Sequence, residues 1–350
     1  MFANITTNLR GEDLRGTTTE IANLQRLSIA ISLKQTCSRL SQETEPSLIA
    51  DLAANIIASY LTDENRSMVA RFRDSISPYL LIKSAIDVNG LPDTPTDDRS
   101  PAEGLWRLPA ATLLGLLKIC GANARSFQDE MGGRLFHMVM PAQNDSKSRL
   151  RSTKALNFHT EVVNGYFIEE CPNLGAPIAP EIFSLACLRN PHSVPTTVLP
   201  LAEVLPYLGQ DTMRTLKLPL YMAKSQSSFD RDIVIDSVPV LIRLDGGGLG
   251  IRYSHSKLAA KTAAAASALA ELRDVIEIFD SSCSVTLQPG DVLILNNKLC
   301  LHGRGEVASS SQFKGSDRWL LRLYGYDEAT LPYLLPAREE GHVMRVLDTQ

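Results

Sequence analysis

The stretch Gln288 to Arg304 reads QPGDVLILNNKLCLHGR, and the rest of the chain is best interpreted around it. It opens with a Pro-Gly-Asp turn signal, runs through an apolar strand over Val292 to Leu295, and breaks at Asn296-Asn297. It then resumes and ends on His302-Gly303, so the pattern predicts two short strands that deliver one histidine. The glycine removes side-chain bulk and leaves room for the imidazole to point into a cavity. Taken alone, such a histidine is more often a structural group.

A second stretch, Leu156 to Tyr166 with the sequence LNFHTEVVNGY, changes that balance. If Leu156 to Val163 is a strand, its side chains alternate, so His159 and Glu161 project from the same face. With His302 alongside, two imidazoles and one carboxylate would leave open positions on an Fe(II) ion. Zinc accepts similar ligands, so this set of residues does not identify the metal.

The order of three motifs resembles a known family. The HTE element is followed by GDVLILNNKLCLHGR and then by DRWLLR at Asp317 to Arg322. Together they resemble the Fe(II)/2-oxoglutarate oxygenases of the clavaminate synthase group, and most of all the amino-acid hydroxylases that act on arginine, asparagine and lysine. The resemblance covers residues 79 to 326. An isolated HxE is weak, whereas HxE, a distal HGR and a trailing R-x-x-x-R in this order are fairly specific.

The resemblance implies the cofactors and the residues that bind them. The two histidines and the carboxylate would bind Fe(II), with 2-oxoglutarate and O2 as co-substrates. Arg318 is the candidate for the distal carboxylate of 2-oxoglutarate, because a guanidinium is a bidentate and permanently charged partner. A threonine in this region bonds a 2-oxoglutarate carboxylate in the related enzymes, and Thr197 is expected in preference to Thr196. Thr-Thr-Val is also ordinary strand composition.

Substrate contacts are expected on the same face. Arg322 follows Arg318 by four residues, so on a strand both project to one side, and the resemblance implies that Arg322 binds the substrate α-carboxylate. Glu161 would also accept the α-ammonium group, and His137 would make a polar contact nearby. The alternatives are arginines paired with acidic loops and a histidine bonded to backbone.

The substrate side chain is expected to be neutral or acidic. Arginine hydroxylases carry acidic residues before the long insertion, where this chain has Tyr253-Ser254-His255-Ser256. A buried cation facing only hydroxyls would cost several kcal/mol, so Ser254 and Ser256 are expected to bond an uncharged or acidic group. A two-residue error in the alignment would overturn this, because Asp245 is close by.

The predicted reaction is hydroxylation of C3 or C4 of an amino acid, free or carrier-bound, in specialised metabolism such as antibiotic biosynthesis. Halogenases of this chemistry lack the carboxylate ligand, so Glu161 favours hydroxylation, while desaturation or cyclisation stays possible. Two other classes remain open. One is a zinc-dependent hydrolase or isomerase, and the other is a catalytically inactive jelly-roll binding protein.

Composition limits the partners and the location. The chain has 350 residues and a net charge of -4, which argues against a nucleic-acid or anionic membrane surface. No secretory signal or membrane span is apparent, and the six cysteines show no close metal spacing. Reduced thiols in a cytoplasmic enzyme that acts on a small molecule are therefore expected.

The predicted architecture is mainly β with flanking helices. Residues 1–78 are expected to be helical, with helices at Ile21 to Ile31 and Ser47 to Tyr60. Residues 79–350 would form one catalytic domain, a distorted double-stranded β-helix (a cupin-like jelly roll). A hairpin turn is expected at Asp245 to Gly248, and an alanine-rich helical insertion at 257–279.

Overall fold

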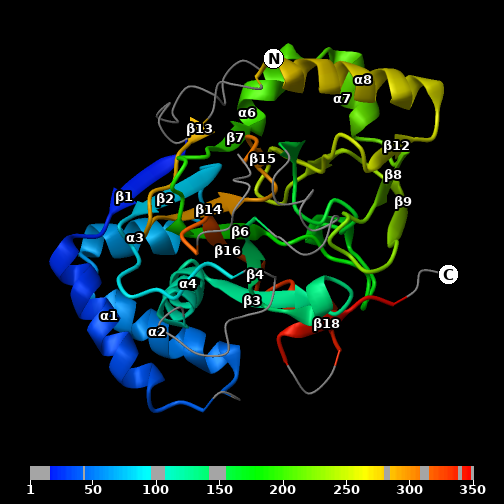
Figure 1. The fold of residues 1–350 in the computed structure, drawn as a ribbon. Coiled ribbons are helices and arrows are strands. Elements are labelled where there is room, and N and C mark those ends of the chain that lie inside the picture. The colour runs from blue at the N-terminus through cyan, green and yellow to red at the C-terminus, as the bar shows by residue number, and fades with distance from the viewer. Residues whose placement is uncertain are drawn as a thin grey trace.

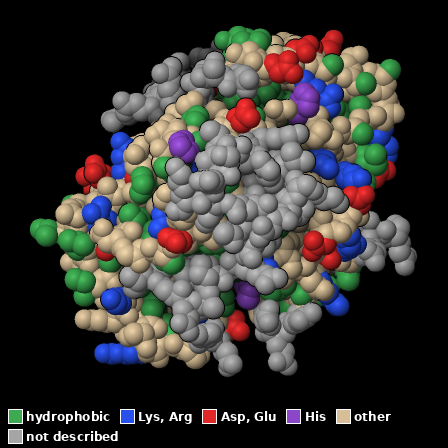
Figure 2. All heavy atoms as spheres, viewed as in Figure 1, with side chains coloured by type: hydrophobic (Ala, Val, Ile, Leu, Met, Phe, Trp, Pro, Cys, Tyr) green, Lys and Arg blue, Asp and Glu red, His purple; other side chains and the backbone are tan. Residues whose placement is uncertain are grey.

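The computed structural model describes residues 16–41, 44–95, 107–141, 155–279, 284–307, 315–337 and 341–347. Strands occupy the centre of the molecule, and helices lie on two opposite sides of them (Figure 1). The described chain is thus mainly β with flanking helices, as predicted. None of its described helices has the length and apolar character that a membrane crossing requires. Acidic and basic side chains are interspersed on the described part of the face in Figure 2.

The largest sheet has nine strands. Its strands follow the order β1-β2-β14-β6-β16-β3-β18-β17, and β4 pairs with β16 beside this path. The bounds are β1 Thr17–Glu20, β2 Tyr79–Lys83, β3 Ala122–Phe127, β4 His137–Val139, β6 Ile182–Arg189, β14 Val292–Asn296, β16 Trp319–Asp327, β17 Leu335–Pro336 and β18 Val343–Arg345. Because β1 pairs in parallel with β2, the N-terminal part also contributes a strand, which the sequence patterns did not predict.

A second sheet has four strands in the order β13-β7-β15-β5. Their bounds are β5 Leu156–His159, β7 Thr196–Pro200, β13 Ser284–Val285 and β15 Cys300–Arg304. Two smaller sheets complete the strands: β8 Tyr221–Lys224 with β9 Val234–Val238 and β12 Leu258–Ala260, and β10 Leu241–Arg243 with β11 Leu249–Ile251. The β10–β11 pair is antiparallel around residues 244–248, which confirms the predicted hairpin.

Strand β14 shows how the layers are built. Val292 and Ile294 belong to one apolar core, and Leu293 and Leu295 belong to another. The first core joins the large sheet to helices α1 Asn23–Cys37, α2 Pro46–Tyr60 and α4 Arg107–Ile119, while α3 Asp63–Arg71 adds Val69. The second core joins the opposite face of the large sheet to the second sheet. Strand alternation therefore lets β14 pack against helices on one side and against strands on the other.

The outer face of the second sheet is covered by a third core. It contains residues of α6 Leu201–Val204, α7 Gln210–Leu216 and α8 Ala263–Ile278, together with residues of the smaller sheets. The described residues also include four single turns of 3₁₀ helix: η2 Met131–Gly133, η3 Ile168–Glu170, η4 Leu205–Tyr207 and η5 Leu331–Tyr333.

The predicted helix at 257–279 begins later than expected. Leu258–Ala260 is the strand β12, which pairs with β8, and the helix starts at Ala263. Thr262 caps the helix, since its side chain accepts a hydrogen bond from the Ala265 N–H. Alanine is tolerated in an edge strand, so composition alone placed the helix start too early. The division into a helical part over 1–78 and a catalytic domain over 79–350 stays a prediction.

Helices α2 and α4 approach closely at Gly115. A β-carbon at this position would lie 2.8 Å from the Ala53 carbonyl carbon. We expect Gly115→Ala to lower the free energy of unfolding by about 1–3 kcal/mol, because the helices must separate even though alanine is the better helix former. Urea unfolding would measure this. Gly246→Ala is the control, because Gly246 has open space around it and should change stability by less than about 0.5 kcal/mol. Unchanged stability of Gly115→Ala would contradict the packing argument.

Candidate metal and substrate site

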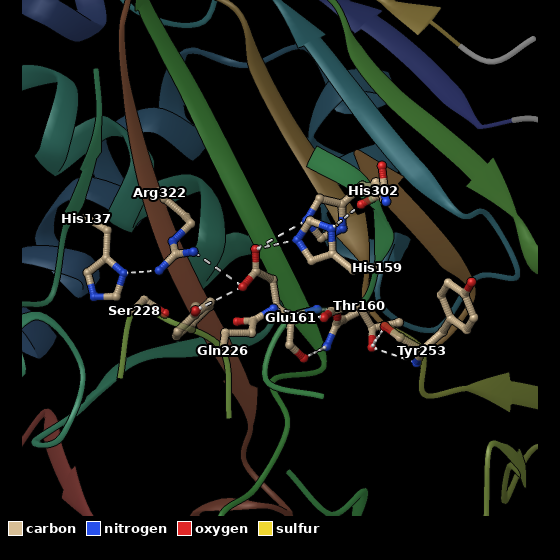
Figure 3. A network of polar contacts seen from close by, with 12 residues as sticks. His137, His159, Thr160, Glu161, Gln226, Ser228, Tyr253, His302 and Arg322 are labelled. Atoms are coloured by element: carbon tan, nitrogen blue, oxygen red, sulfur yellow. Dashed lines mark hydrogen bonds and ion pairs between the residues drawn. The ribbon is translucent and has the colours of Figure 1, made fainter. Parts of the chain in front are cut away.

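Two histidines and one glutamate converge between the two main sheets (Figure 3). His159 ends β5 and lies opposite His302 of β15 in the antiparallel pair. One ligand atom each from His159, Glu161 and His302 lies within 4.8 Å of the others. The predicted convergence of these three residues is confirmed.

The backbone conformation at Glu161 differs from the predicted strand. Strand β5 ends at His159 rather than at Val163, and Glu161 lies in a turn. The Thr160 N–H instead donates to the Tyr253 carbonyl (2.8 Å), which leads the chain away from β15. Val162 then takes a left-handed conformation with φ of 50°, which is rare for a β-branched residue and costs about 1–3 kcal/mol. The turn nevertheless brings the Glu161 carboxylate to 3.2 Å from His302 Nε2.

Hydrogen bonding and burial prepare His159 as a ligand. Its Nδ1 lies 2.8 Å from the Asn157 carbonyl oxygen, which requires the proton on Nδ1 and leaves the Nε2 lone pair free. Burial and the neighbouring His302 lower the pKa of His159 to about 4, so the ring is neutral at neutral pH. His302 is fixed by stacking on Phe183, with ring centroids 4.6 Å apart.

The second oxygen of Glu161 has partners of its own. Glu161 Oε2 accepts hydrogen bonds from the Tyr324 hydroxyl (3.0 Å) and from Arg322 Nη1 (3.4 Å). Burial by itself would raise the pKa of Glu161, but Arg322 and the contact with His302 outweigh it and place that pKa below its ordinary value. Glu161 is therefore a carboxylate whose Oε1 faces the two histidines.

These donors suit a divalent transition metal. Two imidazoles and one carboxylate on a single face match the ligand set of non-haem Fe(II) sites, which leave coordination positions open. Zinc fits the same donors, so the choice of metal depends on the rest of the site.

Two buried arginines form a cationic region. Arg304 lies two residues after His302 on β15, and Arg318 immediately precedes β16. Both are buried, and burial lowers the pKa of each to about 10, with the charge of Arg318 contributing to the shift of Arg304. Among the described residues, Arg318 Nε has no hydrogen-bond partner. A buried guanidinium with a free donor suits an anionic ligand group.

Comparisons with known proteins agree with this geometry. The model of the taurine catabolism dioxygenase TauD, TfdA family matches residues 226–324. Clavaminate synthase 2 of Streptomyces clavuligerus is 28% identical over 289 residues, which are 75% of this chain and 82% of the relative. The L-asparagine oxygenase of Streptomyces coelicolor is 29% identical over 246 residues, 68% of each chain. The chain is therefore similar to dioxygenases of the TauD/TfdA family.

Solved structures of similar fold cover nearly the whole chain. Asparagine oxygenase in complex with Fe(II), 3-hydroxyasparagine and succinate has a TM-score of 0.75 at 22% identity, and the match covers 94% of this chain and 99% of that one. The non-haem iron oxygenase OrfP in complex with Fe and α-ketoglutaric acid has a TM-score of 0.74 at 20% identity, with 94% and 100% covered.

The register of β7 shows which threonine shares the face of the metal-binding residues. On β7, Val198 lies opposite His302 and Thr196 lies opposite Arg304. Directly opposed residues point to the same side of a sheet, so Thr196 shares the metal face. Thr197 lies on the other face, where a β-carbon at Gly303 would come within 2.8 Å of its hydroxyl oxygen. The register therefore does not support the expected contact from Thr197, because the sequence does not show which threonine shares the face of His302.

Glu130 is a buried site residue that the sequence patterns missed. Its Oε1 accepts hydrogen bonds from Arg322 Nη2 (2.9 Å), the Ser228 hydroxyl (2.7 Å) and the Tyr324 hydroxyl (3.2 Å). Burial raises the pKa of Glu130, while Arg322 opposes that shift. Among the described residues, Oε2 finds no partner. The only local signal was an acidic residue between a strand and the Gly132-Gly133 turn.

His137 lies beside Arg322, a pairing that the sequence did not predict. The two residues are directly opposed on β4 and β16, and Arg322 donates a hydrogen bond to His137 Nδ1. Burial and the charge of Arg322 lower the pKa of His137 well below its ordinary value, so the ring is neutral. His137 therefore holds Arg322 in place, and in the described chain its Nε2 has no partner.

The two predicted serines differ in placement. Ser254 is buried, and its backbone pairs with that of His159 in an isolated antiparallel β-bridge. It therefore lies beside the metal-binding residues. Ser256 is exposed in the turn that leads to β12. The predicted substrate contact from Ser256 is therefore not supported. The chain turns after Ser254, so side chains no longer alternate between two faces as they do in a strand.

Loss of one imidazole should abolish tight metal binding. We expect His302→Ala to raise the dissociation constant for Co(II), used alone as the probe, by more than about 100-fold, which exceeds typical effects of residues around metal ligands. Calorimetric titration of metal-free protein would measure it. His255→Ala is the control, because His255 is exposed outside the cluster. Tight stoichiometric binding by the His302→Ala variant would contradict the assignment.

Proposed function

We propose that the chain is an Fe(II)/2-oxoglutarate-dependent oxygenase that hydroxylates C3 or C4 of a free amino acid. The observation that carries this is the convergence of two imidazoles and a carboxylate beside Arg322, with Arg318 buried nearby. His159, Glu161 and His302 would hold Fe(II). When bound, iron and 2-oxoglutarate supply the chemistry that activates O2.

The arginines would divide two carboxylates between them. Arg318 would bind the distal carboxylate of 2-oxoglutarate, since its donors include one without a partner among the described residues. Thr196, which replaces Thr197 in this role, lies on the same face as Arg304 and could contribute a hydroxyl. Arg322 would bind the substrate α-carboxylate, and Glu161 with Glu130 would accept its α-ammonium group.

The charge balance around Arg322 favours a neutral or acidic side chain. Glu130 and Glu161 both pair with Arg322, and no third carboxylate bonds to this network in the described chain. These charges complement a zwitterion, whereas a cationic side chain would add an uncompensated buried charge. Ser254 offers a hydroxyl beside His159.

A free amino acid suits this site better than a carrier-bound one. A thioester to a carrier protein has no α-carboxylate, so it would leave the Arg322 guanidinium without that partner. The relatives named L-lysine 3-hydroxylase and L-asparagine oxygenase also act, by their names, on free amino acids.

The predicted jelly-roll core is compatible with this function. Two sheets that face each other across the metal-binding residues support a jelly-roll core. Desaturation or cyclisation would use the same residues. A role in specialised metabolism and a cytoplasmic location stay predictions.

Anaerobic addition of Fe(II) and then 2-oxoglutarate to metal-free protein should produce a weak visible charge-transfer band. We expect Arg318→Ala to raise the dissociation constant for 2-oxoglutarate by about 30-fold or more, as for a truncated buried charge pair. Arg214→Ala, which changes an exposed arginine, is the control. No band in metal-loaded wild type would favour a zinc enzyme or an inactive binding protein.

Turnover of an amino-acid panel tests the substrate class. We expect asparagine, glutamine or leucine to gain one oxygen by mass spectrometry, and arginine and lysine to react much more slowly. Among the described residues, no carboxylate beyond Glu130 and Glu161, which pair with Arg322, bonds to this network and could serve a cationic side chain. The methyl ester of the best substrate should lose at least about tenfold in kcat/KM, since it cannot pair with Arg322. Arginine as the best substrate would overturn the neutral-side-chain assignment, and equal turnover of the ester would overturn the role of Arg322.

A further inference from the structure

Asn297 bonds to both backbone groups of Glu161. It lies in the connection between β14 and β15, and its residue surface is 1% exposed. Its side-chain oxygen accepts a hydrogen bond from the Glu161 N–H (2.8 Å). Its side-chain nitrogen donates to the Glu161 carbonyl (3.1 Å) and to the Pro180 carbonyl (2.9 Å). One buried carboxamide therefore fixes the backbone of the residue whose carboxylate faces the histidines.

Glu161 needs such support because no strand holds it. Strand β5 ends at His159, and Val162 directly after Glu161 has a φ of 50°. A β-branched residue keeps this conformation only when its surroundings impose it. The hydrogen bonds of Asn297 take the place of a sheet partner for Glu161.

The segment after Glu161 is held at other points. Lys298, the next residue, donates to both carboxylate oxygens of Glu169 (2.8 and 2.9 Å). Arg252 donates to the Gly165 carbonyl (2.8 Å). These bonds stabilise residues 165–170, whereas the hydrogen bonds of Asn297 act on Glu161 itself. Asn297 also lies on the connection that leads into β15, so it links Glu161 to the strand that carries His302.

We propose that Asn297 is a positioning residue of the metal centre. Its carboxamide orients Glu161 toward His159 and His302 before the metal binds. The proposal rests on the proposed function only in assuming that these three residues bind a divalent metal. It assigns a role in affinity and geometry rather than in the reaction itself.

Substitution of the carboxamide tests this role. Asn297→Asp keeps the shape and an acceptor for the Glu161 N–H but removes the donor to the Glu161 and Pro180 carbonyls. We expect its dissociation constant for Co(II) to rise about 10- to 100-fold and the Co(II) absorption bands to change, as for other residues that orient metal ligands.

Asn190→Asp is the matched control. Asn190 is also buried, accepts from the Val194 N–H (3.0 Å), and donates to the carbonyls of Val194 and Leu287 (3.1 Å each). It should lose stability in urea unfolding as Asn297→Asp does, yet keep its Co(II) dissociation constant within about twofold of wild type, since it is not bonded to a metal-binding residue. A wild-type affinity and spectrum for Asn297→Asp, or an equal loss for Asn190→Asp, would overturn the proposal.

Two further outcomes are distinguishable. Wild type that binds no Co(II) contradicts the proposed metal centre itself, whereas a wild type that binds and an unaffected Asn297→Asp contradict only the role of Asn297. If Asn297→Asp does not fold, amide hydrogen exchange of metal-free wild type decides. Slow exchange of the Glu161 N–H supports the preformed bond to Asn297, and exchange at the rate of an unprotected amide overturns it.

Discussion

Glu161 is a carboxylate buried between two sheets, and burial of an anion is tolerated only where cations and hydrogen-bond donors surround it. Arg322 and Tyr324 from the large sheet bond to one oxygen, and His302 from the second sheet lies beside the other. The anion therefore requires both sheets to be in place. Because Arg322 also pairs with Glu130, the three charged groups depend on one another.

Strand β16 links this network to the stability of the fold. Trp319, Leu321 and Leu323 belong to the core that packs on the N-terminal helices. Arg322 and Tyr324 alternate with them and face the second sheet. One strand thus contributes apolar burial on one face and the charged network on the other, so the helices stabilise the strand that carries the network.

Arg322 on β16 and Arg318, which immediately precedes β16, have different surroundings. Arg322 bonds to two carboxylates and to a neutral histidine, which leaves a mixed-charge environment suited to a zwitterion. Arg318 is buried with Arg304 nearby, which makes its environment cationic and suited to a carboxylate group. Under the proposed function, this difference assigns the amino acid to one arginine and 2-oxoglutarate to the other, although both occur in the same short motif.

Sequence alone predicted the features that depend on local alternation and motif order. These include the convergence of His159 and Glu161 with His302, and the mainly β fold. Only the tertiary structure decided that β5 ends at His159, and that Thr196 rather than Thr197 shares the face of His302. It also brought Glu130 and Asn297 to the site, each more than a hundred residues from some of its partners. Periodicity is a local property, whereas register and long-range hydrogen bonds depend on which strands meet, and that follows from packing of the whole chain.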